Sequence, residues 1–500
     1  MMLINVLTRD EMRRLDALTM ETKGMDGAGL MRHAATRMWQ HMRDEGVIAG
    51  KEKTLILAGM GNNGGDALVI AEMMHDDGFA VDVFIVGRLD KMSDEARLQL
   101  AILDKKAIPW LHVTEASRDA FDQALGRCRH LIDGLFGIGF DGVMDLFSSH
   151  LVTAINQADI EVTSIDIPSG LNARNGLTVD VAMQAERTLI VGMYKTGNLL
   201  QDALDVQGKM MLIDIGLADQ TFERERLLVQ HNDVKGLIKP RKHHSHKYDH
   251  GHVLIFGGAP GMMGAPVLAG WAALVTGAGL ATIAYTTQAY RERLDIIPDL
   301  MSVSYAGSKD INGLMPKKRA VLFGVGLGKH RKHTKTLKDV FEWRVPVVVD
   351  ADGLHALKPL IKDMRHEQNV VITPHVGELA RLLDVDVDVV KDDPLTHVEA
   401  LAVTTGMIVV LKGPCTIIAD AHTTRFGVFG NPGLATAGSG DVLAGMIAAL
   451  LAQGHHTMEA AMLGAYLHGL AADAAKQDLG ESSMMASDLM DYIPEAFKSI

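Results

Sequence analysis

The hydrophobic positions of this chain form short apolar runs that alternate with segments of helical spacing. Residues 9–46 recur at roughly helical intervals and predict helix, and the run TLILA (54–58) predicts the first strand after it. Further apolar runs predict strands at 81–87, 130–137, 162–170 and from residue 188 onward. Because short strands alternate with helices, we expect a parallel sheet covered by helices on both faces, a Rossmann-like three-layer α/β/α arrangement.

The pattern changes over residues 217–250, which are polar, charged and poor in periodic apolar content. A second alternation follows, with strands expected at 252–258, 280–285, 320–326, 345–353, 369–375 and 407–413 and a long apolar helix at 442–454. The two halves share no register-matched repeat. We therefore expect two different α/β domains, at 1–217 and 247–500, joined by a linker at 218–246.

Composition narrows the class of protein. A length of 500 residues favours two or more domains, and a net charge of −13 argues against nucleic acid or an anionic membrane as a partner. The chain shows no secretory signal and no apolar stretch long enough to span a membrane. With only two cysteines, Cys128 and Cys415, far apart in the sequence, a reducing compartment is expected, and we predict a cytoplasmic protein.

A glycine-rich loop follows the first predicted strand, with the sequence Gly59-Met-Gly-Asn-Asn-Gly-Gly-Asp66. It matches a phosphate-binding G-x-G-x-x-G pattern, in which backbone N–H groups at a helix N-terminus face an anion. Asn62, Asn63 and Asp66 add amide and carboxylate oxygens, which suit a cation or a polyhydroxylated ligand. The alternative is a capped turn between strand and helix.

More oxygen ligands follow the next strands, because Asp133, Asp166 and Ser169 stand at predicted strand ends. Ligands of parallel sheets bind at the carboxyl ends of the strands, so these side chains should face one crevice with Asn63. Such a set could hold a hard monovalent cation. Lys195, after the following strand, could add a positive charge, although a surface lysine is the alternative.

The segments GNNGGD, DGLFGIG, DIPSGL and a later K-x-G resemble the NAD(P)HX epimerase domain, the YjeF N-terminal family, over residues 5–217. NAD(P)HX is NADH or NADPH hydrated on the nicotinamide ring. Ala67 and Arg32 depart from the family pattern, which has glycine and glutamate there. The resemblance implies a K⁺ site at Asn63, Asp133 and Ser169, and a substrate site at Asn62, Asn63, Gly64, Gly65, Asp66, Gly137, Ile138, Gly139, Phe140, Asp141, Gly142, Val143 and Asp166. Epimerisation needs a proton donor and acceptor, for which Asp166 is the first candidate and Lys195 the second.

The strongest single pattern lies in the second half, where Asn431-Pro-Gly-Leu-Ala-Thr-Ala-Gly-Ser-Gly-Asp441 runs directly into an apolar helix. Glycines let backbone N–H groups converge on an anion at a helix N-terminus. Asp441 could there act as general base on a hydroxyl while the N–H groups hold a phosphate. A plain helix cap would need only Ser439 or Asp441.

Lys412-Gly-Pro-Cys-Thr416 ends another predicted strand, and the glycine, aspartate and histidine groups at 324–328, 350–353 and 373–378 end three more. With the opening segment HSHKYDHGHVL, they resemble the ribokinase-like ADP-dependent NAD(P)HX dehydratase over residues 245–495. That resemblance implies a ribokinase-like α/β/α fold, catalysis by Asp441 and substrate contacts from Gly326, His375, Gly377, Glu378 and Asp441. It implies Mg²⁺-bound ADP at Lys412, Gly413, Pro414, Cys415, Thr416, Asn431, Pro432, Gly433, Leu434, Ala435, Thr436, Ala437, Gly438, Ser439 and Gly440.

Together the two resemblances imply repair of hydrated NADH and NADPH. The first half would interconvert the R and S epimers. The second would use ADP to dehydrate the S form and release NAD(P)H, AMP and phosphate. We also expect a homo-oligomer. Two alternatives remain: the second half could be an ATP-dependent kinase for a vitamin precursor or sugar, and the first could be a non-catalytic binding module. The histidines at 243–252 fit no zinc-site spacing well and are interpreted as a polar segment.

Overall fold

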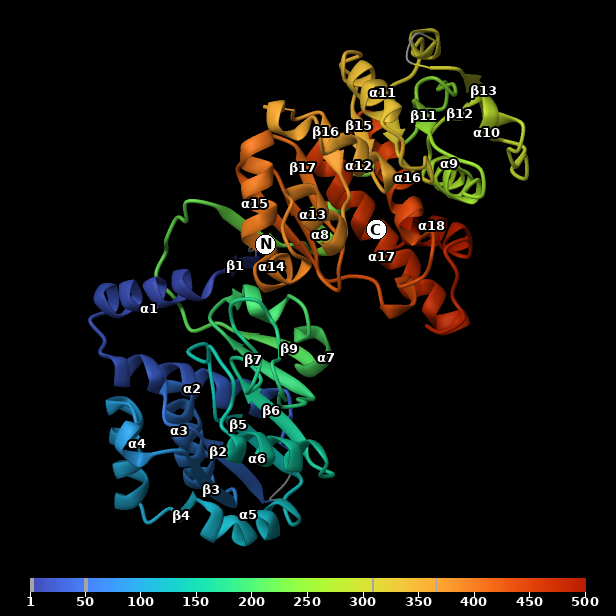
Figure 1. Ribbon diagram of the computed structural model, residues 1–500. Helices are drawn as coiled ribbons and strands as arrows, with labels where there is room; N and C mark the ends of the chain where they lie inside the picture. The colour runs from blue at the N-terminus through green and yellow to red at the C-terminus, as the bar shows by residue number, and fades with distance from the viewer. Residues whose placement is uncertain (1–3, 49–52, 308–309, 366) are drawn as a thin grey trace. The chain divides into compact units, whose positions relative to one another are not determined.

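The structure is a computed structural model that describes residues 4–48, 53–307, 310–365 and 367–500. The chain forms two compact units, Met1–Glu223 and Arg224–Ile500 (Figure 1). Each unit is an α/β fold around a largely parallel sheet, as the alternation of apolar runs predicts.

In the described part of the N-terminal unit, the central sheet has seven parallel strands in the order β4-β3-β2-β5-β6-β7-β9. Their bounds are β2 (Thr54–Ala58), β3 (Val81–Val86), β4 (Trp110–Val113), β5 (His130–Gly134), β6 (Glu161–Ile165), β7 (Arg187–Val191) and β9 (Lys209–Ile213). A short parallel pair stands apart from this sheet, formed by β1 (Ile4–Leu7) and β8 (Tyr194–Lys195). The strand order reverses direction between β2 and β5, the kind of position at which such sheets bind ligands.

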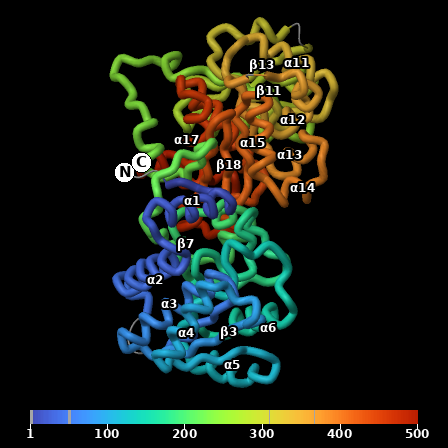
Figure 2. Tube along the Cα trace, turned by 90° about the vertical axis from the view of Figure 1, so that its left-hand side faces the viewer, coloured from blue at the N-terminus to red at the C-terminus, as the bar shows by residue number. Residues whose placement is uncertain are grey.

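Helices cover both faces of this sheet because its strands are buried on both sides. Ile56 and Ala58 pack with α2 (Gly27–Asp44), α3 (Asn62–Asp76) and α4 (Asp94–Lys105), which lie side by side in Figures 1 and 2. Leu55 and Leu57 point the other way, toward α5 (Arg118–Leu125) and α6 (Leu146–Asn156). This alternation follows from the two-residue period of a strand and gives the expected three layers.

The stretch expected to be helical over 9–46 is two helices, α1 (Arg9–Lys23) and α2. The break falls at Gly24, whose φ of 61° lies in the left-handed region that favours glycine. The remaining short helices of the unit are α7 (Ala203–Val206) and the 3₁₀ turns η1 (Leu89–Lys91), η2 (Glu115–Ser117) and η3 (Thr196–Asn198).

The sheet of the C-terminal unit runs in the order β13-β12-β11-β14-β15-β16-β17-β18-β19-β10. It is parallel from β13 to β17, then continues through two antiparallel pairs, and β10 lies parallel to β19. The bounds are β10 (Glu225–Leu228), β11 (His252–Phe256), β12 (Leu280–Thr286), β13 (Met301–Tyr305), β14 (Ala320–Phe323), β15 (Val347–Val349), β16 (Val370–Ile372), β17 (Ile408–Leu411), β18 (Thr416–Ala419) and β19 (Thr423–Gly427).

The main core of this unit lies between one face of the sheet and four helices. Val253 and Ile255 of β11 and Leu322 of β14 pack there against α9 (Gly264–Val275), α16 (Ser439–Ala452), α17 (Thr457–Leu479) and α18 (Leu489–Lys498). The helix expected at 442–454 is α16, which begins three residues earlier. The other helices are α8 (His231–Lys235), α10 (Thr287–Tyr290), α11 (Lys332–Phe341), α12 (Asp352–Leu357), α13 (Val376–Leu383), α14 (Val387–Asp392) and α15 (Pro394–Thr405), with η4 (Ile311–Leu314), η5 (Ile361–Asp363) and η6 (Pro432–Leu434).

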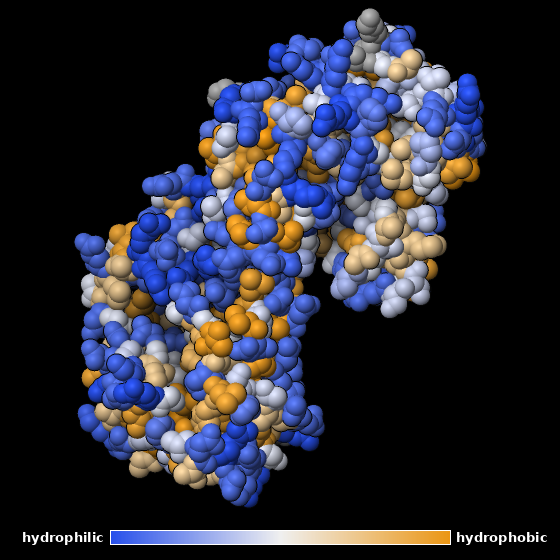
Figure 3. Space-filling view, viewed as in Figure 1, coloured by the Kyte–Doolittle hydropathy of each residue, from blue (hydrophilic) through white to orange (hydrophobic). Residues whose placement is uncertain are grey.

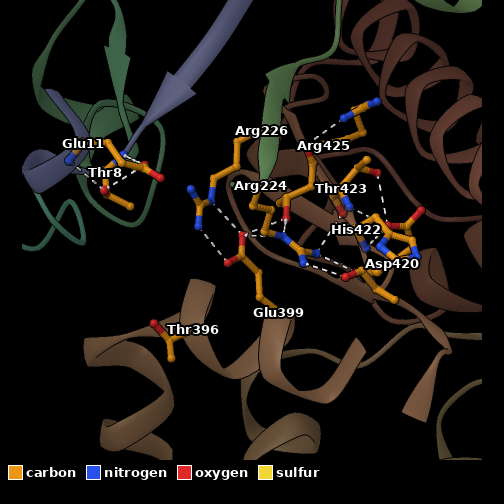
Figure 4. A network of polar contacts seen from close by, with 12 residues as sticks. Thr8, Glu11, Arg224, Arg226, Thr396, Glu399, Asp420, His422, Thr423 and Arg425 are labelled. Atoms are coloured by element: carbon orange, nitrogen blue, oxygen red, sulfur yellow. Dashed lines mark hydrogen bonds and ion pairs between the residues drawn. The ribbon is translucent and has the colours of Figure 1, made fainter. Parts of the chain in front are cut away.

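The structure differs from the expected linker at 218–246, because the chain belongs to the C-terminal unit from Arg224 onward. Arg224 donates to Oγ1 of Thr424 at 2.9 Å, and Arg226 forms a two-pronged pair with Glu399 at 2.8 and 2.9 Å (Figure 4). Val234 of α8 is fully buried in the core. This polar segment can belong to the folded unit because Glu399 and backbone carbonyls neutralise its arginines, which a hydropathy pattern does not reveal.

None of the described helices has the length and apolar character needed to cross a membrane. On the face drawn in Figure 3, hydrophilic residues predominate and apolar residues gather in small groups.

Candidate functional sites

Glycines bring two loops of the N-terminal unit into close contact at the carboxyl ends of β2 and β5. A Cβ on Gly59 would lie 1.8 Å from the carbonyl oxygen of Leu135, and one on Gly64 would lie 2.1 Å from that of Gly59. Larger residues at either position would force the backbone apart. The predicted substrate residues Asn62–Asp66 thereby form the first turn of α3, with Asn62 exposed and Asn63 buried.

The three predicted K⁺ ligands meet around the peptide of Phe136. Nδ2 of Asn63 donates to the Phe136 carbonyl at 2.8 Å, and the Phe136 N–H donates to Oγ of Ser169 at 2.8 Å. Oγ of Ser169 in turn donates to Oδ1 of Asp133 at 2.6 Å. Residues from three separate strand ends are thus brought together, as expected from the sheet topology.

Asp133 is fully buried, and burial raises the pKa of its carboxyl group although the groups that donate to it lower that pKa. These donors are the hydroxyl of Ser164 at 2.8 Å, both the N–H and the hydroxyl of Ser169, and the N–H of Leu135. Among the described residues no positively charged side chain pairs with this carboxylate. A buried carboxylate that receives only neutral donors fits a bound monovalent cation, which would compensate the charge.

Asp166 and Lys195 form a buried ion pair beside these ligands. Nζ of Lys195 donates to Oδ1 of Asp166 and, at 2.8 Å, to the carbonyl of Val191, and its side chain is 1% exposed. The Val191 N–H donates to the same Asp166 oxygen at 3.0 Å. Lys195 is therefore not the surface lysine that was the alternative interpretation. Asp166 has a φ of 65°, in the left-handed region that few residues other than glycine, asparagine and aspartate adopt.

Two more carboxyl groups lie within electrostatic range of this pair. Burial raises the pKa of Asp66 well above its ordinary value, and Asp166 and Asp16 raise it further. Burial also raises the pKa of Asp16 to about 6; Lys195 opposes this shift and Asp166 adds to it. Asp16 lies on α1, outside every motif of the sequence, so the pattern of residues gave no reason to select it.

The predicted substrate loop at 137–143 borders the same region. A Cβ on Gly137 would lie 2.9 Å from Cβ of Asn63, and Asp141 pairs with Arg9 of α1 at 2.5 Å. The ring of Phe140 packs on that of Phe136, with centroids 4.9 Å apart, and Val143 is exposed. The start of the loop, at Gly137, therefore lies against the predicted K⁺ ligand Asn63. The end of the loop, at Val143, is exposed to solvent.

The two departures from the family pattern have structural roles. The methyl group of Ala67 is buried against Gly134. Arg32 pairs with the buried Glu72 of α3 at 2.5 Å, where Gln99 also donates to Glu72 at 2.7 Å. Arg32 therefore compensates a buried charge within the helical layer.

The C-terminal unit contains a pocket of about 550 Å³. Asp441 at the start of α16, Glu378 on α13 and Gly326 after β14 line this pocket. Lys329, Lys358 and Arg381 bring positive charge to its walls. Of the predicted substrate and nucleotide residues, the pocket is lined by Gly326, Glu378, Ala437, Gly438 and Asp441, and it is completed by residues that include Gly261, Leu268, Asp352 and His355.

Asp441 lies in the first turn of α16, as the loop motif predicts. The loop turns into the helix at Gly438, with a φ of 96°, and Oγ of Ser439 donates to the carbonyl of Leu434 at 2.8 Å, which closes the loop. Burial raises the pKa of Asp441 to about 7, with a further rise from Asp350 that Lys412 opposes. A carboxyl group with a pKa near neutrality suits a general base.

The ammonium group of Lys412 lies next to the first turn of α16. A Cβ built on Gly440 would be 3.2 Å from Nζ of Lys412. Nζ donates to Oδ1 of the buried Asp350 at 2.9 Å and lies 3.9 Å from Oε2 of Glu378. Burial lowers the pKa of Lys412, but Asp350 and Glu378 outweigh it and the net shift is upward. Asp350 was not among the predicted site residues, although its place directly after β15 is the signal that could have identified it.

His375 and Gly377 shape the start of α13. Nδ1 of His375 accepts from the Gly377 N–H at 3.1 Å, and the Glu378 carboxylate accepts from the His375 N–H at 2.9 Å, a reciprocal capping arrangement. Burial lowers the pKa of His375, helped by Lys412 and Arg381 and opposed by Glu378. The backbone N–H of His375 thus fixes the Glu378 carboxylate at the pocket.

The outer part of the predicted nucleotide loop is held by a residue that the sequence did not single out. Asn431 donates to Oδ1 of Asp473 on α17 at 3.0 Å and accepts from the Gly433 N–H at 3.0 Å. Gly413 and Pro414 are exposed, whereas Cys415 is buried, and burial raises the pKa of its thiol to about 12. Cys415 is therefore a packed thiol with no nucleophilic character.

Comparisons with known proteins match each of the two units to a family. The family described as YjeF-related protein N-terminus matches residues 27–197, and the family described as NAD(P)H-hydrate dehydratase matches residues 253–495. A ribokinase-like superfamily protein from Enterococcus faecalis superimposes with a TM-score of 0.50 at 25% identity, over 56% of this chain and 98% of its own. An ADP/ATP-dependent NAD(P)H-hydrate dehydratase from Bacillus subtilis, co-crystallised with ATP and Mg²⁺, gives 0.50 at 27% identity, over 54% and 98%.

Full-length relatives cover both units at once. The bifunctional NAD(P)H-hydrate repair enzyme of Moorella thermoacetica is 33% identical over 99% of this chain and 97% of its own length. The enzyme of the same name from Escherichia coli is 33% identical over 97% and 92%. At this identity and coverage, the chain belongs to the family of bifunctional NAD(P)H-hydrate repair enzymes.

Proposed function

We propose that this chain repairs hydrated NADH and NADPH, with epimerisation at the site of the N-terminal unit and ADP-dependent dehydration at the site of the C-terminal unit. One observation carries the proposal. This chain belongs to the family, and each of its two units has a buried carboxylate and lysine close together at the carboxyl ends of the strands. In the first this is Asp166 with Lys195, and in the second Asp441 with Lys412. A non-catalytic module would have no need for either.

Epimerisation requires the C6 hydroxyl of the hydrated ring to leave and return on the other face. The ring nitrogen's lone pair expels the oxygen while an acid protonates it, which gives water and an iminium ion, and a base then removes a proton from the returning water. We assign this exchange to Asp166, and the supporting observation is that Lys195 and the Val191 N–H hold its carboxylate in one orientation. Asp66, whose pKa burial and the nearby Asp166 raise well above its ordinary value, is proposed as a second proton donor.

Dehydration needs a better leaving group than hydroxide. Asp441 takes the proton of the C6 hydroxyl as that oxygen attacks the β-phosphorus of ADP, which breaks the bond to AMP. The ring nitrogen then expels inorganic phosphate and restores NAD(P)H. The helix N-terminus at Gly438–Gly440 and the ammonium group of Lys412 would stabilise the negative charge of the phosphoryl group during transfer.

Two ions belong to the proposal. Asn63, Asp133 and Ser169 would hold K⁺, for which the buried and otherwise uncompensated Asp133 is the supporting observation. Mg²⁺ would accompany ADP, as it accompanies ATP in the Bacillus subtilis structure. Bound Mg²⁺ would neutralise phosphate charge during transfer.

The partners and location follow from the same reasoning. We propose NADHX, NADPHX and ADP as the small molecules bound, no nucleic acid or membrane, and a homo-oligomer in the cytoplasm. The two cysteines are free and buried, which is compatible with a reducing compartment.

The test is recovery of reduced nicotinamide absorbance from an epimeric mixture of NADHX, with ADP, with ATP and without nucleotide. We expect ADP to support complete conversion and to yield AMP and phosphate. A stable phosphoester of a sugar or vitamin precursor would instead establish the kinase alternative. Turnover with ATP alone would overturn the assignment of ADP.

A further inference from the structure

Helix α1 packs against the loop 137–143 of the proposed epimerase site. The matched family segment begins only at residue 27, after this helix. Its first turn is tied to the substrate loop by the Arg9–Asp141 ion pair. Met12 and Leu15 pack in one cluster with Ile138 of that loop, and the end of the Met12 side chain lies beside Gly192. The helix therefore forms a wall of the site.

One face of this wall carries charge. Arg9, Arg13 and Asp16 are spaced i, i+4 and i+7, so their side chains leave the helix on the same side. Asp16 is half-buried and lies within electrostatic range of Lys195 and Asp166. The guanidinium of Arg13 lies at the substrate loop, 3.8 Å from where a Cβ on Gly139 would be. About one helical turn separates Arg13 from Asp16.

Arg13 is exposed, and within the described part of the chain no carboxylate lies at ion-pair distance from it. Its neighbour Arg9 is already engaged by Asp141. Gly139 has no side chain to fill the space in front of the Arg13 guanidinium. An unpaired arginine of this kind lies beside a glycine loop and one turn from Asp16, which is within electrostatic range of the Asp166–Lys195 pair. It suits a phosphate group of a ligand whose reactive ring lies at that pair.

We propose that Arg13 of α1 binds the diphosphate of the hydrated dinucleotide in the epimerase site. The inference rests on the proposed function of that site. The diphosphate of NADHX is joined to the nicotinamide through one ribose, so a phosphate near Arg13 leaves the ring close to Asp166 and Lys195. Arg13 thus positions the substrate and takes no part in the proton transfers.

The experiment compares Arg13→Ala, Arg13→Lys and Arg14→Ala in the full chain. Arg14 is the matched control, because it is equally exposed but projects about 100° away around the helix. Epimerisation would be followed by chromatography, and its inhibition by ADP-ribose, which carries the diphosphate without the reactive ring, would be measured in the same assay.

Loss of a charge-assisted hydrogen bond should raise KM and the ADP-ribose inhibition constant of Arg13→Ala by about 10- to 100-fold, with kcat little changed. Arg13→Lys should lie between, and Arg14→Ala should match the wild type, as should ADP-dependent dehydration in every variant. Equal behaviour of Arg13→Ala and Arg14→Ala would overturn the inference and leave the proposed function standing. A wild-type chain that does not epimerise NADHX would overturn both.

Discussion

Nζ of Lys412 lies 2.9 Å from Oδ1 of Asp350, immediately beneath the turn in which α16 begins. The pair places one positive charge among the carboxyl groups of Asp350, Glu378 and Asp441. Because Lys412 opposes the rise in the pKa of Asp441, removing it would push that pKa higher and leave the proposed base protonated at neutral pH.

The first prediction separates catalysis from folding at this site. Asp441→Asn keeps the shape of the side chain but cannot accept a proton, so ADP-dependent dehydration should fall by ~10²–10⁴. Epimerisation should be unchanged, because Asp441 and the epimerase residues belong to different units. Both assays are run on one purified variant, and near-normal dehydration by a folded protein would show that Asp441 is only a helix-capping residue.

The second prediction concerns pH. Because a pKa of about 7 leaves Asp441 largely protonated below neutrality, dehydration should accelerate as pH rises through about 7 and then level off. The folded protein favours the protonated form of Asp441 more than the unfolded chain does. The free energy of unfolding should therefore fall as pH rises from the ordinary pKa of 3.8 to about 7.

The matching stability measurement compares melting temperatures of the wild type and Asp441→Asn. The variant lacks the ionisation, so its stability relative to the wild type should improve as pH rises from about 4 to about 7 and then level off. A difference that stays constant with pH would contradict the raised pKa.

The third prediction addresses the cation. Crystals soaked in rubidium salt should show an anomalous peak within coordination range of Asn63, Asp133 and Ser169. Ser169→Ala should reduce the activation of epimerisation by potassium, because a proposed K⁺ ligand is lost. The same hydroxyl accepts from the Phe136 N–H and donates to Asp133. Ser164→Ala is the control, because Ser164 also donates to Asp133 but lies outside the proposed ligand set. The cation assignment fails if no peak appears, or if epimerisation proceeds equally well without potassium.

The fourth prediction places the boundary between independently folding pieces. A fragment that begins at residue 224 should be soluble and active in dehydration, whereas one that begins at residue 247 should be unstable. The shorter fragment lacks β10 and leaves Glu399 half-buried without Arg224 and Arg226. Urea unfolding of both fragments provides the measurement, and equal midpoints would show that the edge strand contributes little.

The sequence predicted most of the buried parallel strands, because strands such as β2 and β17 are almost entirely apolar. Glycine follows β2 directly, and a lysine follows β17. It did not predict β4, β9 and β13, which end their sheets and are only partly buried, nor the charged strand β10 and the antiparallel strands β18 and β19. Strands with polar or exposed positions lack that contrast. Asp133, Asp166 and Asp441 could be selected because each stands directly after an apolar run or within a glycine motif. Asp16 and Asp473 could not, because each lies within a helix and reaches its site only through tertiary packing.

The pairing of β10 with β19 also has a consequence for synthesis. About two hundred residues separate Arg224 from its partner Thr424, so this edge of the C-terminal sheet cannot close until most of the chain has left the ribosome. All residues of the N-terminal unit, which ends at Glu223, have by then been synthesised, so this unit can begin to fold while translation continues. For the time between these two events, Arg224–Leu228 is an unpaired strand edge, and the two arginines on it offer the charge that discourages pairing with another chain.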